Sequence, residues 1–177
     1  MSSAQPAAGP PWPAVGVART AYRTTEQTPI QSALNLVKTG VVELVEAARP
    51  GLLGLDGFSH AWLLTWLDRP VDPDGEAPLV LVPFLLRPTG EQQGVFATRA
   101  PRRPTPIGLS LVRLVAVTAT GFSFAGVDLL DGTPVLDVKP YVEAFDRPTG
   151  EVRSGWFDTV DPRPGTRPMD LGPGSRS

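Results

Sequence analysis

The chain has 177 residues, enough for one domain with a substantial core, and 41% of them are hydrophobic, as in a globular protein. It holds no cysteine and one histidine, which excludes disulfides and thiolate or multi-histidine metal sites and argues against a Ser-His-Asp triad. The net charge of -2 does not suit a protein that clamps nucleic acid across a broad face, so a nucleic-acid partner would need a local basic patch.

The composition along the chain separates one central domain from two tails. Residues 1–13 are small and Pro-rich and are predicted to be flexible, and residues 14–146 form the domain. Residues 147–177 are rich in Pro, Gly and Arg and are predicted to be partly disordered, with Trp156 and Phe157 able to dock onto a core. No apolar run could span a membrane and no signal peptide is recognisable, so we expect a cytoplasmic protein that binds neither membrane nor metal.

Short apolar runs between turn residues predict a chain of strands. In chain order they are 15–22, 40–45, 58–67, 80–86, 95–98, 109–119, 122–128 and 135–138. Thr120-Gly121 has the composition of a two-residue hairpin turn. A short helix is predicted at 46–53, although Pro50 interrupts it, and 31–38 is either helical or a loop. So many strands with so little helix predict a mostly β fold, a barrel or a sandwich; we favour a small single-domain β-barrel with few short helices, because closure removes exposed strand edges.

The segment 58–67 is apolar on both faces at period two, which is typical of a central strand. Its aromatic residues share one face with His60. We interpret His60 as a core histidine with satisfied hydrogen bonds, and Trp62 and Trp66 as core residues.

Two polar segments are candidates for chemistry. Residues 94–110 hold three arginines and three prolines, and a stiff loop that presents guanidinium groups suits carboxylate or phosphate recognition; an ordinary solvated turn is an equally open reading. In residues 125–142, Asp128, Asp131 and Asp137 lie at strand ends or turns, and Asp131 precedes a glycine in a strong turn signal. These carboxylates could hold an ammonium or a ribose, although capping of turns by Asp is the commoner role.

Four strings, GVARTAY, LDGFSHAWLLTW, GVFATRAPRRPTPIGLSLVRL and DLLDGTPVLDVKPYV, cover most of residues 14–142. In this order they resemble the TsaA-like (VirR/TrmO) family of S-adenosylmethionine-dependent tRNA methyltransferases. The resemblance implies an enzyme that works as a homodimer and binds S-adenosylmethionine among loops near the subunit interface. The reaction it implies is methylation of the exocyclic amine of threonylcarbamoyl-modified adenosine beside the tRNA anticodon. We expect no counterpart of the additional C-terminal domain of the longer members.

The resemblance also implies site residues, with Arg99 as partner of the cofactor's carboxylate and Asp128 as partner of its ammonium. No catalytic base is identified. The implied cofactor-binding residues are Pro29, Ile30, Gln31, Asp68, Arg69, Arg99, Leu109, Ala125, Gly126, Val127 and Asp128. The implied acceptor-binding residues are Arg102, Arg103, Thr105, Lys139 and Tyr141.

Several positions depart from the family pattern. Family members usually have arginine at Ile30, histidine at Asp68, and phenylalanine and asparagine at Arg102 and Thr105 of the arginine-proline loop. These departures leave the methyl acceptor open between tRNA and a small molecule of specialised metabolism. A sensor that binds the cofactor without turnover is a third reading. A small-molecule enzyme would have an enclosed apolar pocket, whereas a tRNA enzyme would have a positive patch of Arg99, Arg102, Arg103 and Lys139.

Overall fold

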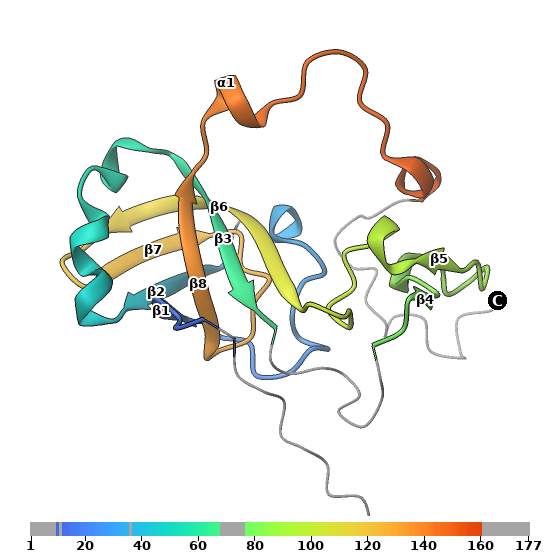
Figure 1. The fold of residues 1–177 in the computed structure, drawn as a ribbon, viewed down its shortest axis with the longest axis horizontal. Helices are drawn as coiled ribbons and strands as arrows, with labels where there is room; N and C mark the ends of the chain where they lie inside the picture. The colour runs from blue at the N-terminus through green and yellow to red at the C-terminus, as the bar shows by residue number, and fades with distance from the viewer. Residues whose placement is uncertain (1–9, 11, 36, 68–76, 161–177) are drawn as a thin grey trace, which may run out of the picture.

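The computed structural model describes residues 10, 12–35, 37–67 and 77–160. Six antiparallel strands pair in the order β1-β2-β7-β6-β3-β8, and β1 also pairs with β8, so the hydrogen-bonded ring closes on itself as in a barrel (Figure 1). The prediction of a mostly β chain is confirmed. The six strands are β1 (Gly16–Arg19), β2 (Thr39–Leu44), β3 (His60–Trp66), β6 (Ile107–Val117), β7 (Gly121–Ala125) and β8 (Thr133–Pro140).

Helical structure is short throughout the described part of the chain. One α-helix, α1 (Glu143–Asp146), makes a single turn after β8. The other helical segments are 3-10 turns: η1 (Ser32–Leu34), η2 (Glu46–Leu52), η3 (Leu55–Gly57), η4 (Phe84–Leu86), η5 (Val95–Ala97) and η6 (Gly155–Thr159). The expected helix at 46–53 is therefore present as η2, with Pro50 inside it. None of the described helices is long and apolar enough to cross a membrane.

The core lies inside the closed sheet and follows from alternation along the strands. In β2 the residues at even positions are buried and their neighbours are exposed, as a half-buried strand requires. Phe122 and Phe124 of β7 fill the interior together with Val42, Leu63 and Val112. The predicted hairpin between β6 and β7 is confirmed, and the Thr118 N–H donates to the Gly121 carbonyl at 2.8 Å.

The aromatic face of β3 points the opposite way from our interpretation. Ala61, Leu63 and Thr65 are fully buried, whereas Trp62 and Trp66 are only half-buried on the outer face. The interior already holds two phenylalanines, and it accepts the smaller set of β3 side chains in place of two indoles. His60 is likewise outside the core: its Nδ1 lies 2.9 Å from Ser59 Oγ, which is exposed.

The predicted strands at 80–86 and 95–98 are mostly wrong. Only β4 (Val80–Leu81) and β5 (Gln93–Gly94) pair, as a separate two-stranded sheet. Pro83 precedes η4 and has no N–H to extend the ladder. In η5, Thr98 Oγ1 donates to the Val95 carbonyl at 2.9 Å, so this carbonyl is satisfied locally and not by a neighbouring strand.

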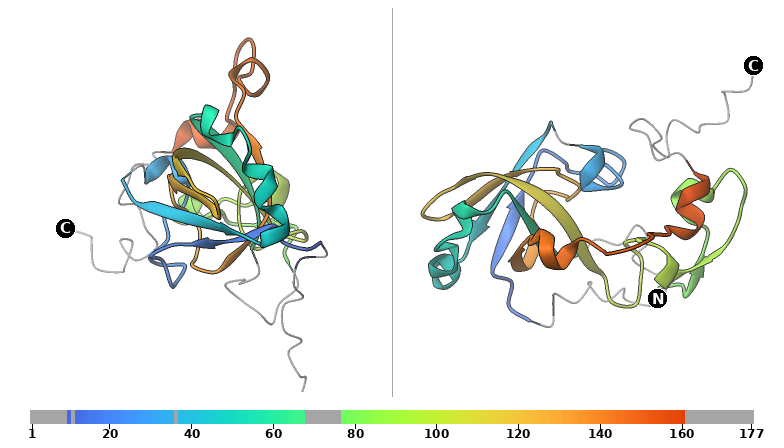
Figure 2. Two further views of the ribbon diagram at one scale, coloured as in Figure 1. Left: turned by 90° about the vertical axis from the view of Figure 1, so that its left-hand side faces the viewer. Right: turned by 90° about the horizontal axis from the view of Figure 1, so that it is seen from above.

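The segment after β8 returns toward this small sheet. From α1 the chain runs to η6, which lies beside the part of the molecule that carries β4 and β5 (Figures 1 and 2). The indole Nε1 of Trp156 donates to the Ala97 carbonyl at 2.8 Å, and its ring stacks on Phe157 at 3.9 Å between centroids. Trp156 thus joins the C-terminal segment to the stretch just before the arginine-rich loop.

Candidate functional site

Asp128 connects three segments at the end of the closed sheet where β6 begins and β7 ends. Gly126, with φ of 91°, lets the chain turn after β7. The carboxylate of Asp128 accepts hydrogen bonds from Ser110 Oγ on β6, at 2.7 Å, and from the backbone N–H of Ser32 in η1, at 2.9 Å. One carboxylate therefore binds β6 and η1 to the segment after β7.

Burial raises the pKa of Asp128 to about 6, because the charged form loses hydration. The hydrogen bonds from Ser110 and Ser32, and the positive charge of Arg99, oppose this shift. Near neutral pH the group is mostly ionised, and it titrates within the physiological range.

Arg99 lies beside the same cluster. Its Nη1 donates to the Oε1 of Gln31 at 2.7 Å, and the Nε2 of Gln31 donates to the Ile30 carbonyl at 2.7 Å. The guanidinium is exposed, so it keeps donors available for an anion. Gln31, Arg99 and Asp128, expected from the sequence to act together, thus meet from three distant parts of the chain.

Two tethers complete the cluster, and sequence reasoning missed them. The Nδ2 of Asn35 donates both to Tyr22 OH and to the Val127 carbonyl, each at 2.9 Å. Ser110 is 4% exposed and faces inward between apolar neighbours on β6. A polar residue at an inward strand position requires a buried hydrogen-bond partner, but the apolar pattern of β6 does not show that Ser110 turns inward, because Leu109 and Leu111 flank it.

The remaining expected cofactor residues differ in how they could contribute. Leu109 is 53% exposed and lies on the outer face of β6, opposite in direction to Ser110. Ala125 and Val127 are buried in the fold, so they could offer only backbone atoms. Pro29 and Ile30 are half-buried in the segment before η1. Asp68 and Arg69 fall outside the described residues.

The expected acceptor residues divide into two groups that a single chain does not bring together. Arg102, Arg103 and Thr105 share the loop of Arg99, and the Nη1 of Arg103 donates to the Thr98 carbonyl at 3.2 Å. Lys139 forms an ion pair with Asp137 at 2.9 Å and stands opposite Trp62 in the ladder.

Tyr141 belongs with Lys139. Its N–H donates to the His60 carbonyl at 3.0 Å, and its ring centroid lies 6.3 Å from those of His60 and Trp62. The arginine loop instead leads into Ile107, which pairs with Trp66. Trp62 and Trp66 are four residues apart, about 13 Å along a strand. Lys139 therefore does not join the arginine patch within one chain.

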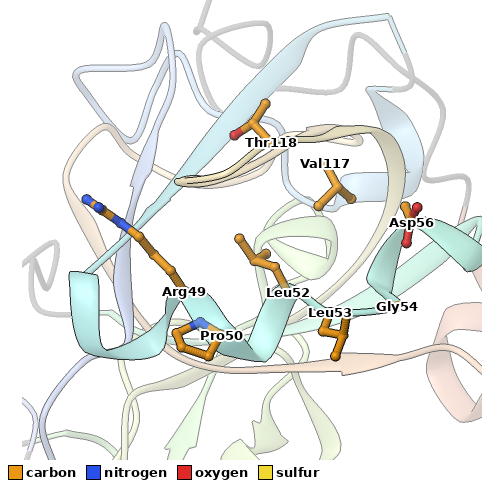
Figure 3. A pocket seen from close by; sticks show the side chains of 8 residues that line it. All are labelled: Arg49, Pro50, Leu52, Leu53, Gly54, Asp56, Val117 and Thr118. Atoms are coloured by element: carbon orange, nitrogen blue, oxygen red, sulfur yellow. The ribbon is translucent and has the colours of Figure 1, made fainter.

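Two hollows lie at the other end of the closed sheet. One, of about 380 Å³, lies between η2, η3 and the end of β6, with Arg49 and Asp56 on opposite sides of Leu52 and Val117 (Figure 3). The other, of about 390 Å³, shares Leu52 with it and extends to Phe122 under the sheet. Neither is lined by an implied cofactor- or acceptor-binding residue, but the second is lined by Asp137, one of the three candidate carboxylates named from the sequence. No group of three or more acidic or histidine side chains in the described ranges could hold a metal ion.

Comparison with known proteins supports the resemblance over the same part of the chain. Residues 17–147 match the family model described as the tRNA-methyltransferase O N-terminal domain. A probable S-adenosyl-L-methionine-binding protein of Archaeoglobus fulgidus is 36% identical over 149 residues, which are 84% of this chain and 38% of that protein. The tRNA (adenine(37)-N6)-methyltransferase of Mus musculus is 43% identical over 97 residues, 55% of this chain and 22% of that protein.

The crystal structure of TrmO from Pseudomonas aeruginosa matches with a TM-score of 0.64 at 35% identity, over 80% of this chain and 60% of that one. The chain thus spans less than two thirds of each of these three proteins. The match of the family model nevertheless covers most of the present chain, including both sides of the Asp128 cluster. The chain therefore belongs to the family of tRNA-methyltransferase O N-terminal domains.

Proposed function

We propose that this chain is a methyltransferase domain that binds S-adenosylmethionine at the cluster of Gln31, Arg99 and Asp128. The observation that carries the proposal is the contact of Arg99 with Gln31 beside the Asp128 carboxylate, since these residues come from three separate segments. The Archaeoglobus fulgidus relative is named a probable S-adenosyl-L-methionine-binding protein, which supports the choice of cofactor. Pro29, Ile30, Leu109 and the backbone of 125–127 complete the proposed cofactor site, with Asp68 and Arg69.

Methyl transfer from S-adenosylmethionine to an amine depends more on the positioning of the two reactants than on a strong base. The exposed guanidinium of Arg99 suits the cofactor's carboxylate, and the ionised Asp128 suits its ammonium. The cofactor supplies an electrophilic methyl group on a sulfonium. Holding an amine in line with that methyl group is worth up to about 7–11 kcal/mol in the best cases. The amine can lose its proton after the methyl has arrived, so a chain with one histidine suffices for this reaction.

We propose tRNA as the acceptor, at the exocyclic amine of threonylcarbamoyl-modified adenosine beside the anticodon. We also propose that the protein is cytoplasmic. The name of the mouse relative supports N6 of adenosine 37. Arg102, Arg103 and Thr105 in the loop of Arg99 would contact the RNA backbone next to the cofactor. The two hollows at the far end of the sheet do not adjoin this cluster, so neither of them would hold a small-molecule acceptor beside the cofactor.

We propose further that the chain is a homodimer. The outer positions of β3 and β6 form three cross-strand pairs in which both residues are apolar: Trp62 with Leu111, Leu64 with Leu109, and Trp66 with Ile107. Outward positions of a solvated sheet are normally polar, so a second copy is the natural cover for this outer ladder. Lys139 and Tyr141, which lie away from the arginine loop of their own chain, could then serve the site of the partner.

The experiment that tests the proposal is transfer of labelled methyl from S-adenosylmethionine to bulk tRNA from a strain that lacks its own enzyme of this family. We expect label in tRNA that carries the threonylcarbamoyl group and none in tRNA without it. Arg99→Ala should abolish cofactor binding measured by calorimetry. If the cofactor binds but tRNA takes up no label, the acceptor is a small molecule; if small molecules are also inert, the chain is a sensor. No binding of the cofactor would refute the proposal as a whole.

A further inference from the structure

The carboxylate of Asp128 is already engaged by two protein donors. Its Oδ1 accepts from Ser110 Oγ and its Oδ2 from the Ser32 N–H, at 2.7 and 2.9 Å. Both donors are neutral, and Ser110 and Ser32 are both buried. The carboxylate is therefore held at a fixed place between β6 and η1, whether or not a ligand is present.

The hydrogen bond from the Ser32 N–H to Asp128 satisfies the first N–H of η1. Ser32 is the first residue of η1, and the first N–H groups of a helical turn have no partner within the turn. Gln31 precedes it with an extended backbone and provides no side-chain cap. Asp128, 96 residues further along the chain, supplies the missing acceptor. The position of η1 relative to the sheet therefore depends on this carboxylate.

The fixed position of Ser32 also affects Arg99, because Gln31 lies between them. Gln31 is covalently next to Ser32, so fixing the Ser32 N–H also fixes the backbone from which the Gln31 side chain starts. The Gln31 amide oxygen in turn accepts from Arg99 Nη1 at 2.7 Å. Contacts run without a gap from Ser110 through Asp128, Ser32 and Gln31 to the guanidinium; we call this series the Asp128 relay.

We propose that Asp128 is a positioning residue that sets the place of Arg99 through Ser32 and Gln31, beyond any direct contact of its own with the cofactor. The inference rests on the proposed function only for the ligand, S-adenosylmethionine. Arg99 also acts electrostatically on Asp128, since its positive charge favours the ionised carboxylate. Protonation of Asp128 would remove the negative acceptor of the Ser32 N–H and so loosen the relay at its centre.

A double-mutant cycle separates positioning from direct contact. Dissociation constants for S-adenosylmethionine are measured by calorimetry for the wild type, Asp128→Asn, Gln31→Ala and the double variant. We expect each single change to weaken binding about tenfold, and the double variant to be within about threefold of either single one, since both changes break the same relay. If the two effects multiply to about a hundredfold, Asp128 acts separately from Gln31 and the relay is refuted.

Two further variants test the relay: Ser110→Ala removes one of its hydrogen bonds, and Asp131→Asn is the matched control for Asp128→Asn. Ser110→Ala leaves the charge of Asp128 in place and removes one of its tethers, so the relay predicts weaker binding here too. Asp131 also accepts from a backbone N–H, that of Thr20 at 3.1 Å, but belongs to another loop. Asp131→Asn should leave the dissociation constant within about twofold of the wild-type value. Unchanged binding in Ser110→Ala would contradict the relay, even if Asp128→Asn proved unable to fold.

A readout without ligand keeps this inference distinct from the proposed function. In the wild type, the amide resonance of Ser32 should shift with pH in step with the titration of Asp128, and those of Gln31 and the Arg99 side chain should follow at the same midpoint. A Ser32 amide that does not respond to pH between 4.5 and 8 would overturn the relay. Failure of the wild type to bind the cofactor, with this titration intact, would refute the proposed function alone.

Discussion

At the scale of single residues, the ionised form of Asp128 lowers the stability of the fold. Its pKa is raised to about 6 from an ordinary value of 3.8, chiefly by burial. A carboxyl group with a raised pKa in the folded state favours folding while it is protonated, and this contribution is lost as the pH rises from about 4 through 6. The whole shift corresponds to about 3 kcal/mol, of which about 2 kcal/mol is lost between pH 4 and pH 7. The ionised group is therefore kept at neutral pH at a cost to the fold.

Asp128→Asn should remove this pH dependence. We expect the free energy of unfolding of the variant, relative to the wild type, to increase by about 2 kcal/mol between pH 4 and pH 7. Urea unfolding at a series of pH values measures the difference. Asp131→Asn is the control with the opposite sign: the N–H of Thr20 and the ion pair with Arg23 lower the pKa of Asp131, so its stabilisation is lost only as the pH falls. If the free energies of unfolding of the wild type and Asp128→Asn change in parallel with pH, the raised pKa of Asp128 is contradicted.

The contacts around Asp128 also show what the sequence could not provide. Arg99 and Asp128 were found through the motif strings, which are contiguous. Ser32 and Asn35 act on partners 96 and 92 residues away, and nothing in their local sequence indicates those partners. Ser110 was equally hard to find, because apolar Leu109 and Leu111 flank it and turn outward while Ser110 turns inward. Both the burial of this polar side chain and the identity of its partner therefore require the fold.

At the scale of elements, apolar runs bounded by turn residues predicted the long strands but not the irregular segments. β2 and β6 fall within two residues of their expected limits, because β-forming apolar residues dominate both segments. The stretch 95–98 has the composition of a strand, yet Thr98 takes the Val95 carbonyl and a 3-10 turn forms. In β3 both faces are apolar, so the pattern predicted the strand but could not decide which face turns inward.

The contact of η6 with the stretch just before the arginine-rich loop can be tested at this scale. Trp156→Phe removes the hydrogen bond to the Ala97 carbonyl and preserves most of the stacking on Phe157. We expect hydrogen exchange in peptides spanning 95–99 and 153–160 to become about fivefold faster, corresponding to one lost hydrogen bond of about 1 kcal/mol. Trp12→Phe, at an exposed tryptophan, should leave exchange in both peptides unchanged. Unaltered exchange in Trp156→Phe would show that the indole does not hold η6 in solution.

At the scale of the whole molecule, the Asp128 cluster and the two hollows lie at opposite ends of the closed sheet, and the apolar ladder lies on its outer face. The Asp128 cluster lies where β6 begins, and the hollows lined by η2 and η3 lie where it ends. The outer ladder of β3 and β6 starts beside the cluster, since Ser110 faces inward to Asp128 while its neighbour Leu109 faces outward. A partner that covers the ladder would therefore border the proposed cofactor site, as the family resemblance implies.

Leu111→Glu tests whether a second copy covers this ladder. Leu111 pairs with Trp62 at the centre of the outer face, and its side chain lies outside the core, so a carboxylate there should spare the fold. Burying that charge against an apolar partner surface would be costly, and we expect the particle mass by light scattering to fall from twice 18.8 kDa to 18.8 kDa. Thr120→Glu, which adds the same charge at the exposed β6–β7 turn, should remain a dimer. A wild type that is already a monomer at micromolar concentration would contradict the dimer. A Leu111→Glu variant that stays dimeric would place the interface on another face, and Lys139 and Tyr141 would then lose their proposed route to the partner's site.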